Sequence, residues 1–142
     1  MLIGINPLIN PDVLYVLAAM GHGDCIALVD SNFPATSIAT HTIHPEVLRM
    51  DCSTPQALQA ILSLFPLDTF VDDAVRSMQV VGDPHAIPAV IAEASPLLGE
   101  QFTIQGIERY AFYEATKQSF AILQTGEQRI YGNLILRKGV IA

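Results

Sequence analysis

Two segments of the sequence carry side chains that could move or orient protons. In Gly21-His22-Gly23 an imidazole stands between two residues without side chains, so a ligand can approach it closely. An imidazole titrates at about pH 6.5 and can therefore accept or donate a proton near neutrality. Asp30 follows the apolar run Cys25–Val29, and its carboxylate could orient hydrogen-bond donors. The alternatives are an ordinary surface turn for His22 and a cap or turn former for Asp30.

A third segment, residues 130–134, places the polar residues Tyr131 and Asn133 two positions apart in an otherwise apolar stretch. In a β-strand these two side chains would share one face, and Gly132 between them removes bulk from the opposite face. Polar groups on a face that otherwise packs in a core need hydrogen-bond partners. The pattern is therefore equally consistent with hydrogen-bond partners within the protein and with a pocket that binds a ligand.

Strands that alternate with helices are predicted to carry these groups. The expected strands cover residues 25–29, 46–51, 74–81, 120–123 and 130–136, and the expected helices cover residues 11–20, 54–65, 86–94 and 108–117. The last two strands are expected to form a hairpin through residues 125–128. This pattern predicts one α/β domain, residues 1–142, with a mixed, largely parallel sheet and flanking helices. Ligands of such sheets bind at the carboxyl ends of strands, and His22 would approach Asp30 only if its loop folded back over the strand between them.

The composition excludes several classes of protein. The chain has 142 residues, of which 51% are hydrophobic and 15% charged, the opposite of what intrinsic disorder requires. Its formal charge of −7 argues against nucleic acid and anionic membranes as partners, because both attract basic surfaces. No apolar run approaches the roughly 18 residues of a membrane span, and the N-terminus lacks a secretory pattern. We therefore expect a cytoplasmic protein with Cys25 and Cys52 as free thiols, whose apolar content reflects either a partner-covered surface or a well-packed core.

The sequence gives no support for a metal or a nucleotide cofactor. His41 and His44 have a spacing that suits metal ligands, but Pro45 follows and no third ligand is near, so a solvated turn is the favoured interpretation. Neither a GxGxxG motif, nor a P-loop, nor a GxSxG motif is present. Dinucleotide enzymes, nucleotide hydrolases and serine hydrolases therefore have no support.

Longer motifs resemble those of the fucose mutarotases and the related ribose pyranases. They follow in the same order along nearly the whole chain: Met20-Gly21-His22-Gly23-Asp24, Asp30-Ser31-Asn32-Phe33-Pro34, Glu108-Arg109-Tyr110-Ala111-Phe112-Tyr113-Glu114, Thr125-Gly126-Glu127 and Tyr131-Gly132-Asn133-Leu134. The segment around Arg109 resembles the fucose branch, because the ribose branch typically carries histidine at that position. Residues 37–44 depart from the family pattern, which leaves the preferred sugar open.

The resemblance implies a mutarotase that interconverts the α and β anomers of L-fucose or a similar sugar without a metal or other cofactor. His22 would be the catalytic acid/base and Tyr131 a proton relay or hydroxyl ligand, while Asp30, Arg109, Tyr131 and Asn133 would bind the substrate. The resemblance also implies a ring-shaped homodecamer with sites near subunit contacts. The alternatives are a ribose-type pyranase, a non-catalytic sugar-binding or transport-accessory module that needs no His22, and a structural ring protein with a vestigial pocket.

Overall fold

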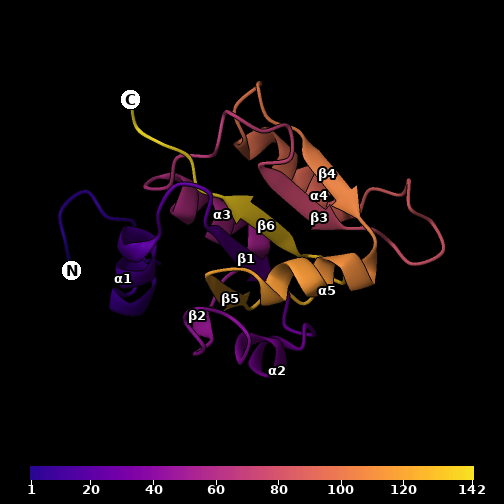
Figure 1. Cartoon of the computed structure of the whole chain (residues 1–142), viewed down its shortest axis with the longest axis horizontal. Coiled ribbons are helices and arrows are strands. Elements are labelled where there is room, and N and C mark those ends of the chain that lie inside the picture. The colour runs from indigo at the N-terminus through magenta and orange to yellow at the C-terminus, as the bar shows by residue number, and fades with distance from the viewer.

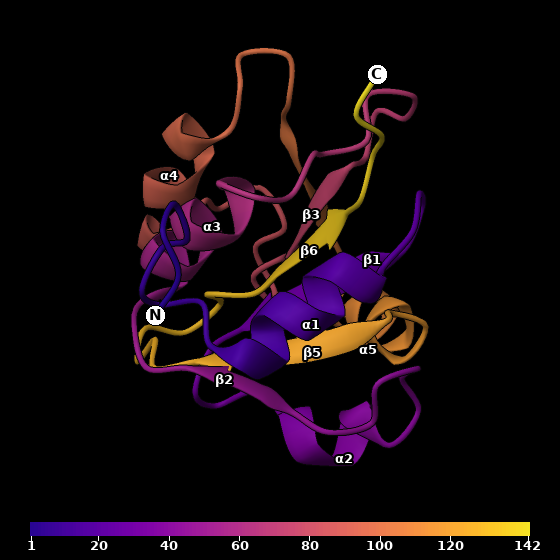
Figure 2. The same cartoon turned by 90° about the vertical axis from the view of Figure 1, so that its left-hand side faces the viewer.

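The computed structural model describes residues 1–142 as a six-stranded sheet with helices on both faces (Figures 1 and 2). The helices are α1 (Pro11–Ala19), α2 (Ala35–Ala39), α3 (Thr54–Leu62), α4 (Ala89–Ala94) with the 3-10 turn η1 (Ser95–Leu97), and α5 (Arg109–Lys117). The strands are β1 (Cys25–Val29), β2 (Leu48–Met50), β3 (Val75–Met78), β4 (Ile104–Ile107), β5 (Ala121–Thr125) and β6 (Leu134–Arg137). None of the helices is long and apolar enough to cross a membrane.

The sheet has the order β2-β5-β1-β6-β3-β4. β1 pairs in parallel with β5 and antiparallel with β6, while β3 pairs in parallel with β4 and antiparallel with β6. β6 is therefore the one strand that runs against the other five, because β2 is also parallel to β5. The predicted mixed, largely parallel α/β fold is confirmed. We call the edge where β1 to β5 end the carboxyl edge, and the edge where they begin the amino edge.

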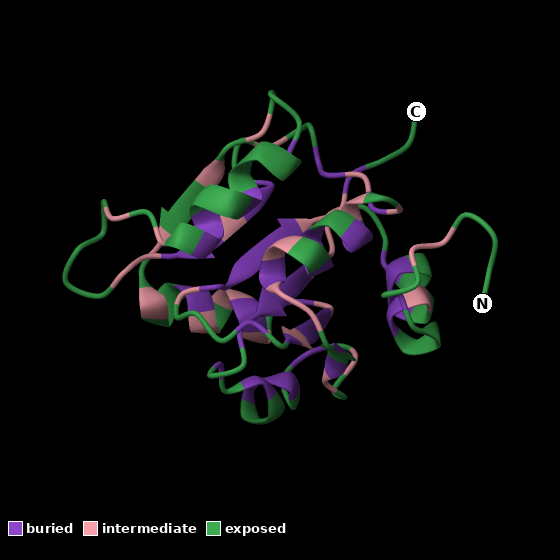
Figure 3. Ribbon diagram, turned by 180° about the vertical axis from the view of Figure 1, so that it is seen from behind, coloured by how far each residue is buried: buried purple, intermediate pink, exposed green.

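Apolar side chains on both faces of the sheet explain why helices cover both. Ile26 and Leu28 of β1 point into a larger core that includes buried residues of α1, α3 and α4. Ala27 and Val29 point into a smaller core with α2 and with Phe112 of α5. Figure 3 shows the result, with buried residues concentrated in the sheet and exposed ones on the outer faces of the helices. A strand that is apolar on both faces requires such a sandwich.

Capping side chains fix where the longer helices begin. The side chain of Asn10 accepts a hydrogen bond from the Val13 amide, which confirms the predicted start of α1. Ser53 caps α3 and forms a reciprocal capping box with Gln56. The Glu108 carboxylate accepts from two amides in the first turn of α5. Each cap satisfies backbone donors that the helix itself leaves free.

The predicted hairpin of residues 120–136 is wrong. β5 and β6 do not pair with each other, because β1 lies between them and pairs with both. The segment that joins them, residues 126–133, is a loop that crosses the end of β1. It is held there by contacts with Asp30, which a local turn pattern does not reveal. Two further elements, α2 and the edge strand β4, were not predicted at all.

The placement of Tyr131 and Asn133 on a strand is wrong for the same reason. β6 begins only at Leu134, so both residues lie in the preceding loop. Tyr131 has a φ of 64°, the one positive φ among the non-glycine residues. This left-handed conformation is unfavourable for a residue with a side chain and incompatible with an extended strand. The two side chains are therefore presented by a tight turn and not by one face of the sheet.

Candidate functional site

Asp30 and Asn133 form a reciprocal pair at the carboxyl edge. Asp30 follows β1 and is 3% exposed. Its Oδ2 accepts from Asn133 Nδ2 at 3.0 Å and from the Gly132 amide at 3.1 Å, while Asn133 Oδ1 accepts from the Asp30 amide at 2.8 Å. Burial raises the pKa of the Asp30 carboxyl, although the hydrogen bonds that it accepts act in the opposite direction. The structure thus brings together two of the predicted substrate-binding residues, and each one fixes the backbone that carries the other.

Tyr131 lies beside this pair and connects it to the segment after β3. Its hydroxyl oxygen accepts a hydrogen bond of 3.1 Å from the Val81 amide. Because the Tyr131 oxygen only accepts in this contact, its own O–H group remains free to donate to another acceptor. The side chain can therefore donate a proton or a hydrogen bond to a ligand at this edge.

Arg109 lies at the same edge of the sheet, after a different strand. It is the first residue of α5 and follows, after Glu108, the strand β4, which ends at the carboxyl edge. Its guanidinium donates to the Tyr110 hydroxyl at 2.9 Å and lies 4.7 Å from the centre of the Tyr110 ring. Its Nε is buried and has no hydrogen-bond partner in the chain. Arg109 forms no hydrogen bond with Asp30 or Asn133, and its buried Nε is a donor that has no acceptor in the chain.

His22 lies at the amino edge and pairs with a carboxylate that the sequence analysis did not identify. His22 Nε2 is 3.3 Å from Asp68 Oδ2, and the imidazole is 44% exposed whereas Asp68 is 1% exposed. The Phe70 ring meets the imidazole edge-on at a centroid distance of 5.6 Å. A buried carboxylate next to an accessible imidazole is the arrangement that orients a histidine for proton transfer.

Two further donors hold Asp68 in place. Its Oδ1 accepts from the Phe70 amide at 3.0 Å, and its Oδ2 accepts from Arg137 Nε, also at 3.0 Å. The Phe70 amide makes the largest contribution to lowering the pKa of Asp68, followed by Arg137 and His22. Asp68 is therefore a carboxylate at neutral pH. It was missed because 46 residues separate it from His22, and an aspartate in a loop after a helix is too common to stand out.

The predicted residues therefore divide between two edges of the sheet. Asp24 and Asp30 stand at the two ends of β1, and at about 3.3 Å per residue they are separated by roughly 20 Å, with His22 in the turn next to Asp24. The loop that carries His22 does not fold back over the strand, because the Gly23 amide donates to the Lys138 carbonyl at the amino edge. One copy of the chain does not unite His22 with Asp30, Tyr131, Asn133 and Arg109.

Other reactive groups are scattered. No group of three or more His, Cys, Asp or Glu side chains is placed to hold a metal ion. His41 and His44 follow α2 in the predicted turn. Cys25 and Cys52 are both free, as predicted. Burial raises the pKa of each thiol, which makes neither a ready nucleophile.

Known proteins resemble the chain over nearly its full length. The sequence model of the RbsD / FucU transport protein family matches residues 3–141. Human fucose mutarotase is 43% identical over 146 residues, which cover 98% of this chain and 94% of the human protein. The L-fucose mutarotase of Actinobacillus pleuropneumoniae serotype 5b is 39% identical over 145 residues, 99% of this chain and 97% of that protein. The crystal structure of the fucose mutarotase from Streptococcus pneumoniae in complex with L-fucose is 38% identical, with a TM-score of 0.88 over 99% of this chain and 100% of that one.

Proposed function

The chain belongs to the RbsD / FucU transport protein family, and from this premise we propose that it is a mutarotase that interconverts the α and β anomers of L-fucose or a similar monosaccharide. The resemblance on which the sequence analysis relied is confirmed at the level of the family. The observation that carries the proposal is the pair of His22 and the buried Asp68. A reaction that moves protons on and off sugar oxygens needs an oriented group of this kind.

In this proposal the complete site forms where two copies of the chain meet. The amino edge of one copy supplies His22 and Asp68, and the carboxyl edge of the other supplies the sugar-binding residues Asp30, Arg109, Tyr131 and Asn133. Exposed apolar side chains flank both halves: Phe70, which is 72% exposed, lies beside His22, and Ile130, which is 66% exposed, lies beside Tyr131. Large exposed apolar groups at both edges support burial against a second copy.

The same reasoning supports a closed ring, and the family resemblance implies that this ring is a homodecamer. Each copy has one amino edge and one carboxyl edge, so the contact between copies is head-to-tail and closes into a ring when the rotation permits. Light scattering should give a mass about ten times that of one chain. A monomer at micromolar concentration would contradict a site that two copies share.

The proposed reaction needs two proton transfers and no other reagent. Neutral His22 accepts the proton of the anomeric hydroxyl while the Tyr131 hydroxyl donates its proton to the ring oxygen. The bond between the anomeric carbon and the ring oxygen breaks, and the open-chain aldehyde forms. Rotation about the neighbouring carbon–carbon bond presents the other face of the carbonyl, and closure reverses both transfers. Asp68 stays ionised throughout and stabilises the imidazolium.

Saturation-transfer NMR on L-fucose, with D-ribose for comparison, tests the proposal. We expect faster exchange between the α and β anomers of L-fucose in the presence of the protein, at a rate that EDTA does not change. Faster pyranose–furanose exchange of D-ribose alone would favour the second candidate, a ribose-type pyranase. Binding of a sugar without exchange would favour a sugar-binding or transport-accessory module.

Three substitutions separate the roles within the site. His22→Ala should abolish exchange while L-fucose still binds, because the imidazole transfers protons and contributes little to the free energy of sugar binding. Arg109→Ala should weaken binding first, since a guanidinium cannot act as a base near neutral pH. Tyr131→Phe keeps the ring, so a lower rate with unchanged affinity would identify a proton relay. Exchange by NMR and affinity by calorimetry are measured for each variant, and wild-type exchange in His22→Ala would contradict the proposed acid/base.

We also propose a cytoplasmic location, which the two free cysteines support because structural disulfides form in oxidising compartments.

A further inference from the structure

We propose that Glu127 is a positioning residue for the sugar-binding loop: it fixes the turn that presents Tyr131 and Asn133, although it does not touch the sugar itself. This inference deepens the proposed function and rests on it. Glu127 belongs to the loop between β5 and β6, and it is 4% exposed. A buried carboxylate requires partners for both of its oxygens, and those partners show what the residue holds together.

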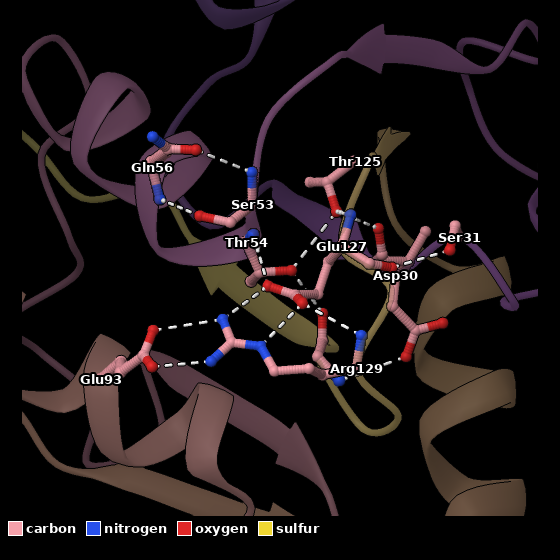
Figure 4. A network of polar contacts seen from close by, with 11 residues as sticks. Asp30, Ser31, Ser53, Thr54, Gln56, Glu93, Thr125, Glu127 and Arg129 are labelled. Atoms are coloured by element: carbon pink, nitrogen blue, oxygen red, sulfur yellow. Dashed lines mark hydrogen bonds and ion pairs between the residues drawn. The ribbon is translucent and has the colours of Figure 1, made fainter.

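The Glu127 carboxylate joins the loop to α3 and to Arg129 (Figure 4). Its Oε1 accepts from the Arg129 amide at 3.0 Å and from Arg129 Nε at 2.9 Å. Its Oε2 accepts from Arg129 Nη2 at 2.9 Å and from the Thr54 amide at 3.3 Å, at the start of α3. On the outer side, the Arg129 guanidinium forms two hydrogen bonds with Glu93, of 2.6 and 3.1 Å. Arg129 is thus clamped between one buried and one exposed carboxylate, which are 4% and 54% exposed.

The backbone and stem of Glu127 join the loop to the segment that carries Asp30. The Glu127 carbonyl accepts from both the amide and the hydroxyl of Ser31, at 2.9 and 2.8 Å. A Cβ added at Gly132 would lie 2.8 Å from Glu127 Cγ, so the glutamate stem packs directly on the backbone of the turn. Thr54 completes the enclosure, because its hydroxyl donates to the Gly132 carbonyl at 2.8 Å.

These contacts stabilise the left-handed backbone conformation of Tyr131, which is unfavourable without them. Tyr131, with its φ of 64°, precedes Gly132, and the Gly132 amide donates to Asp30. A left-handed tyrosine is stable only when contacts on both sides of it over-determine the turn. Asp30 supplies one set of contacts, and Glu127 with Thr54 and Arg129, here called the Glu127 cluster, supplies the other. Removing the cluster therefore frees the residue that presents the catalytic hydroxyl.

The test compares Glu127→Gln with Glu93→Gln, which removes the exposed carboxylate from the same arginine and serves as the matched control. For each variant, KM and kcat are measured by NMR exchange of L-fucose, Kd by calorimetry, and the folded fraction by circular dichroism. Glu127→Gln should raise KM and Kd by about tenfold or more, because a displaced turn loses its alignment with the sugar. Glu93→Gln should stay within about twofold of wild type. A purely structural role would lower kcat in proportion to the folded fraction and leave KM and Kd unchanged, which would overturn the proposal.

A second pair of variants covers the case in which Glu127→Gln does not fold. Thr54→Val removes the hydroxyl that donates to Gly132, and it should raise KM and accelerate solvent exchange of the Gly132 amide proton. Thr54→Ser retains the hydroxyl and should restore both values. Wild-type KM and amide protection in Thr54→Val would show that the contacts of the Glu127 cluster with Gly132 do not hold the turn, and would overturn the proposal. Failure of the proposed function looks different, because the wild-type protein itself would then leave L-fucose exchange unchanged.

Discussion

Asp68→Asn should strongly slow anomer exchange while leaving sugar binding intact. The substitution keeps the shape of the side chain and exchanges one acceptor oxygen for an amide group that only donates. In the protein, Oδ1 accepts from the Phe70 amide, and Oδ2 accepts from Arg137 Nε and faces His22 Nε2. All three neighbours can be donors, so the variant cannot satisfy them in either orientation of the amide.

The size of the effect follows from these two orientations. If the amide oxygen accepts from Phe70, the amide nitrogen faces Arg137 and can pair with His22 only as a donor, which imposes the wrong tautomer on the imidazole. If the oxygen instead faces Arg137 and His22, the nitrogen opposes the Phe70 amide and displaces the loop. A correctly positioned acid–base group typically contributes about 10²- to 10⁴-fold to the rate, and a wrong tautomer of the histidine can cost about 10⁴-fold. We expect a loss of at least about 100-fold in kcat.

The assay is saturation-transfer NMR on L-fucose together with calorimetry of sugar binding. Asp73→Asn is the matched control, because it makes the same substitution at an exposed carboxylate near the same loop. Exchange in Asp68→Asn within about threefold of wild type, in a protein that remains folded, would refute the reasoning that His22 depends on Asp68.

Three further predictions concern stability and are measured by urea or thermal unfolding. Lys138→Met should lower the free energy of unfolding by about 1–2 kcal/mol, because the Lys138 ammonium donates to two carbonyl oxygens at the end of α1. Gly139→Ala should cost about 1–3 kcal/mol, since the new Cβ would lie 2.5 Å from the Leu67 carbonyl oxygen, and backbone atoms cannot yield as a side chain can. Hydrogen bonds from Arg129 lower the pKa of Glu127 from its ordinary value of 4.5 to about 2, so its stabilising contribution is complete above pH 4.5 and is lost as the pH falls toward 2. Glu127→Gln should therefore be less stable than wild type at pH 7, and the difference should shrink across that acidic range.

The sequence predicted correctly those elements whose bounds depend on neighbouring residues in the chain. The helix predicted over residues 11–20 begins where α1 begins, at Pro11, and the apolar run before Asp30 predicted β1 with its observed bounds, Cys25–Val29. β4 was missed because it is an edge strand, only half-buried and interrupted by Gly106. An edge strand lacks the continuous apolar run of a central strand, and its pairing partner decides that it is a strand.

The features that the sequence did not predict depend on contacts between residues far apart in the chain. The hairpin prediction was wrong because β1 lies between β5 and β6 in the sheet. The residues of the connecting segment do not indicate that a third strand separates the two. Asp30, Tyr131 and Asn133 were identified as a group, and the structure places them together, yet through a turn and not a strand. The pairing of His22 with Asp68 depends on the packing of the loop after α3 against the end of β6, where Leu67 bridges to Lys138. No spacing rule in the sequence describes such a contact.

Subunit complementation tests the central claim, a sugar site shared between two copies, most directly. His22→Ala and Tyr131→Phe, each of which should be inactive or nearly so alone, are unfolded together in equal amounts, refolded, and assayed for L-fucose exchange. If one copy supplies His22 and its neighbour supplies Tyr131, random assembly leaves both residues intact in about a quarter of the sites, so about a quarter of wild-type activity should return. If the mixture stays as inactive as the separate variants although light scattering shows mixed assemblies, the two residues act within one chain and the shared site is contradicted.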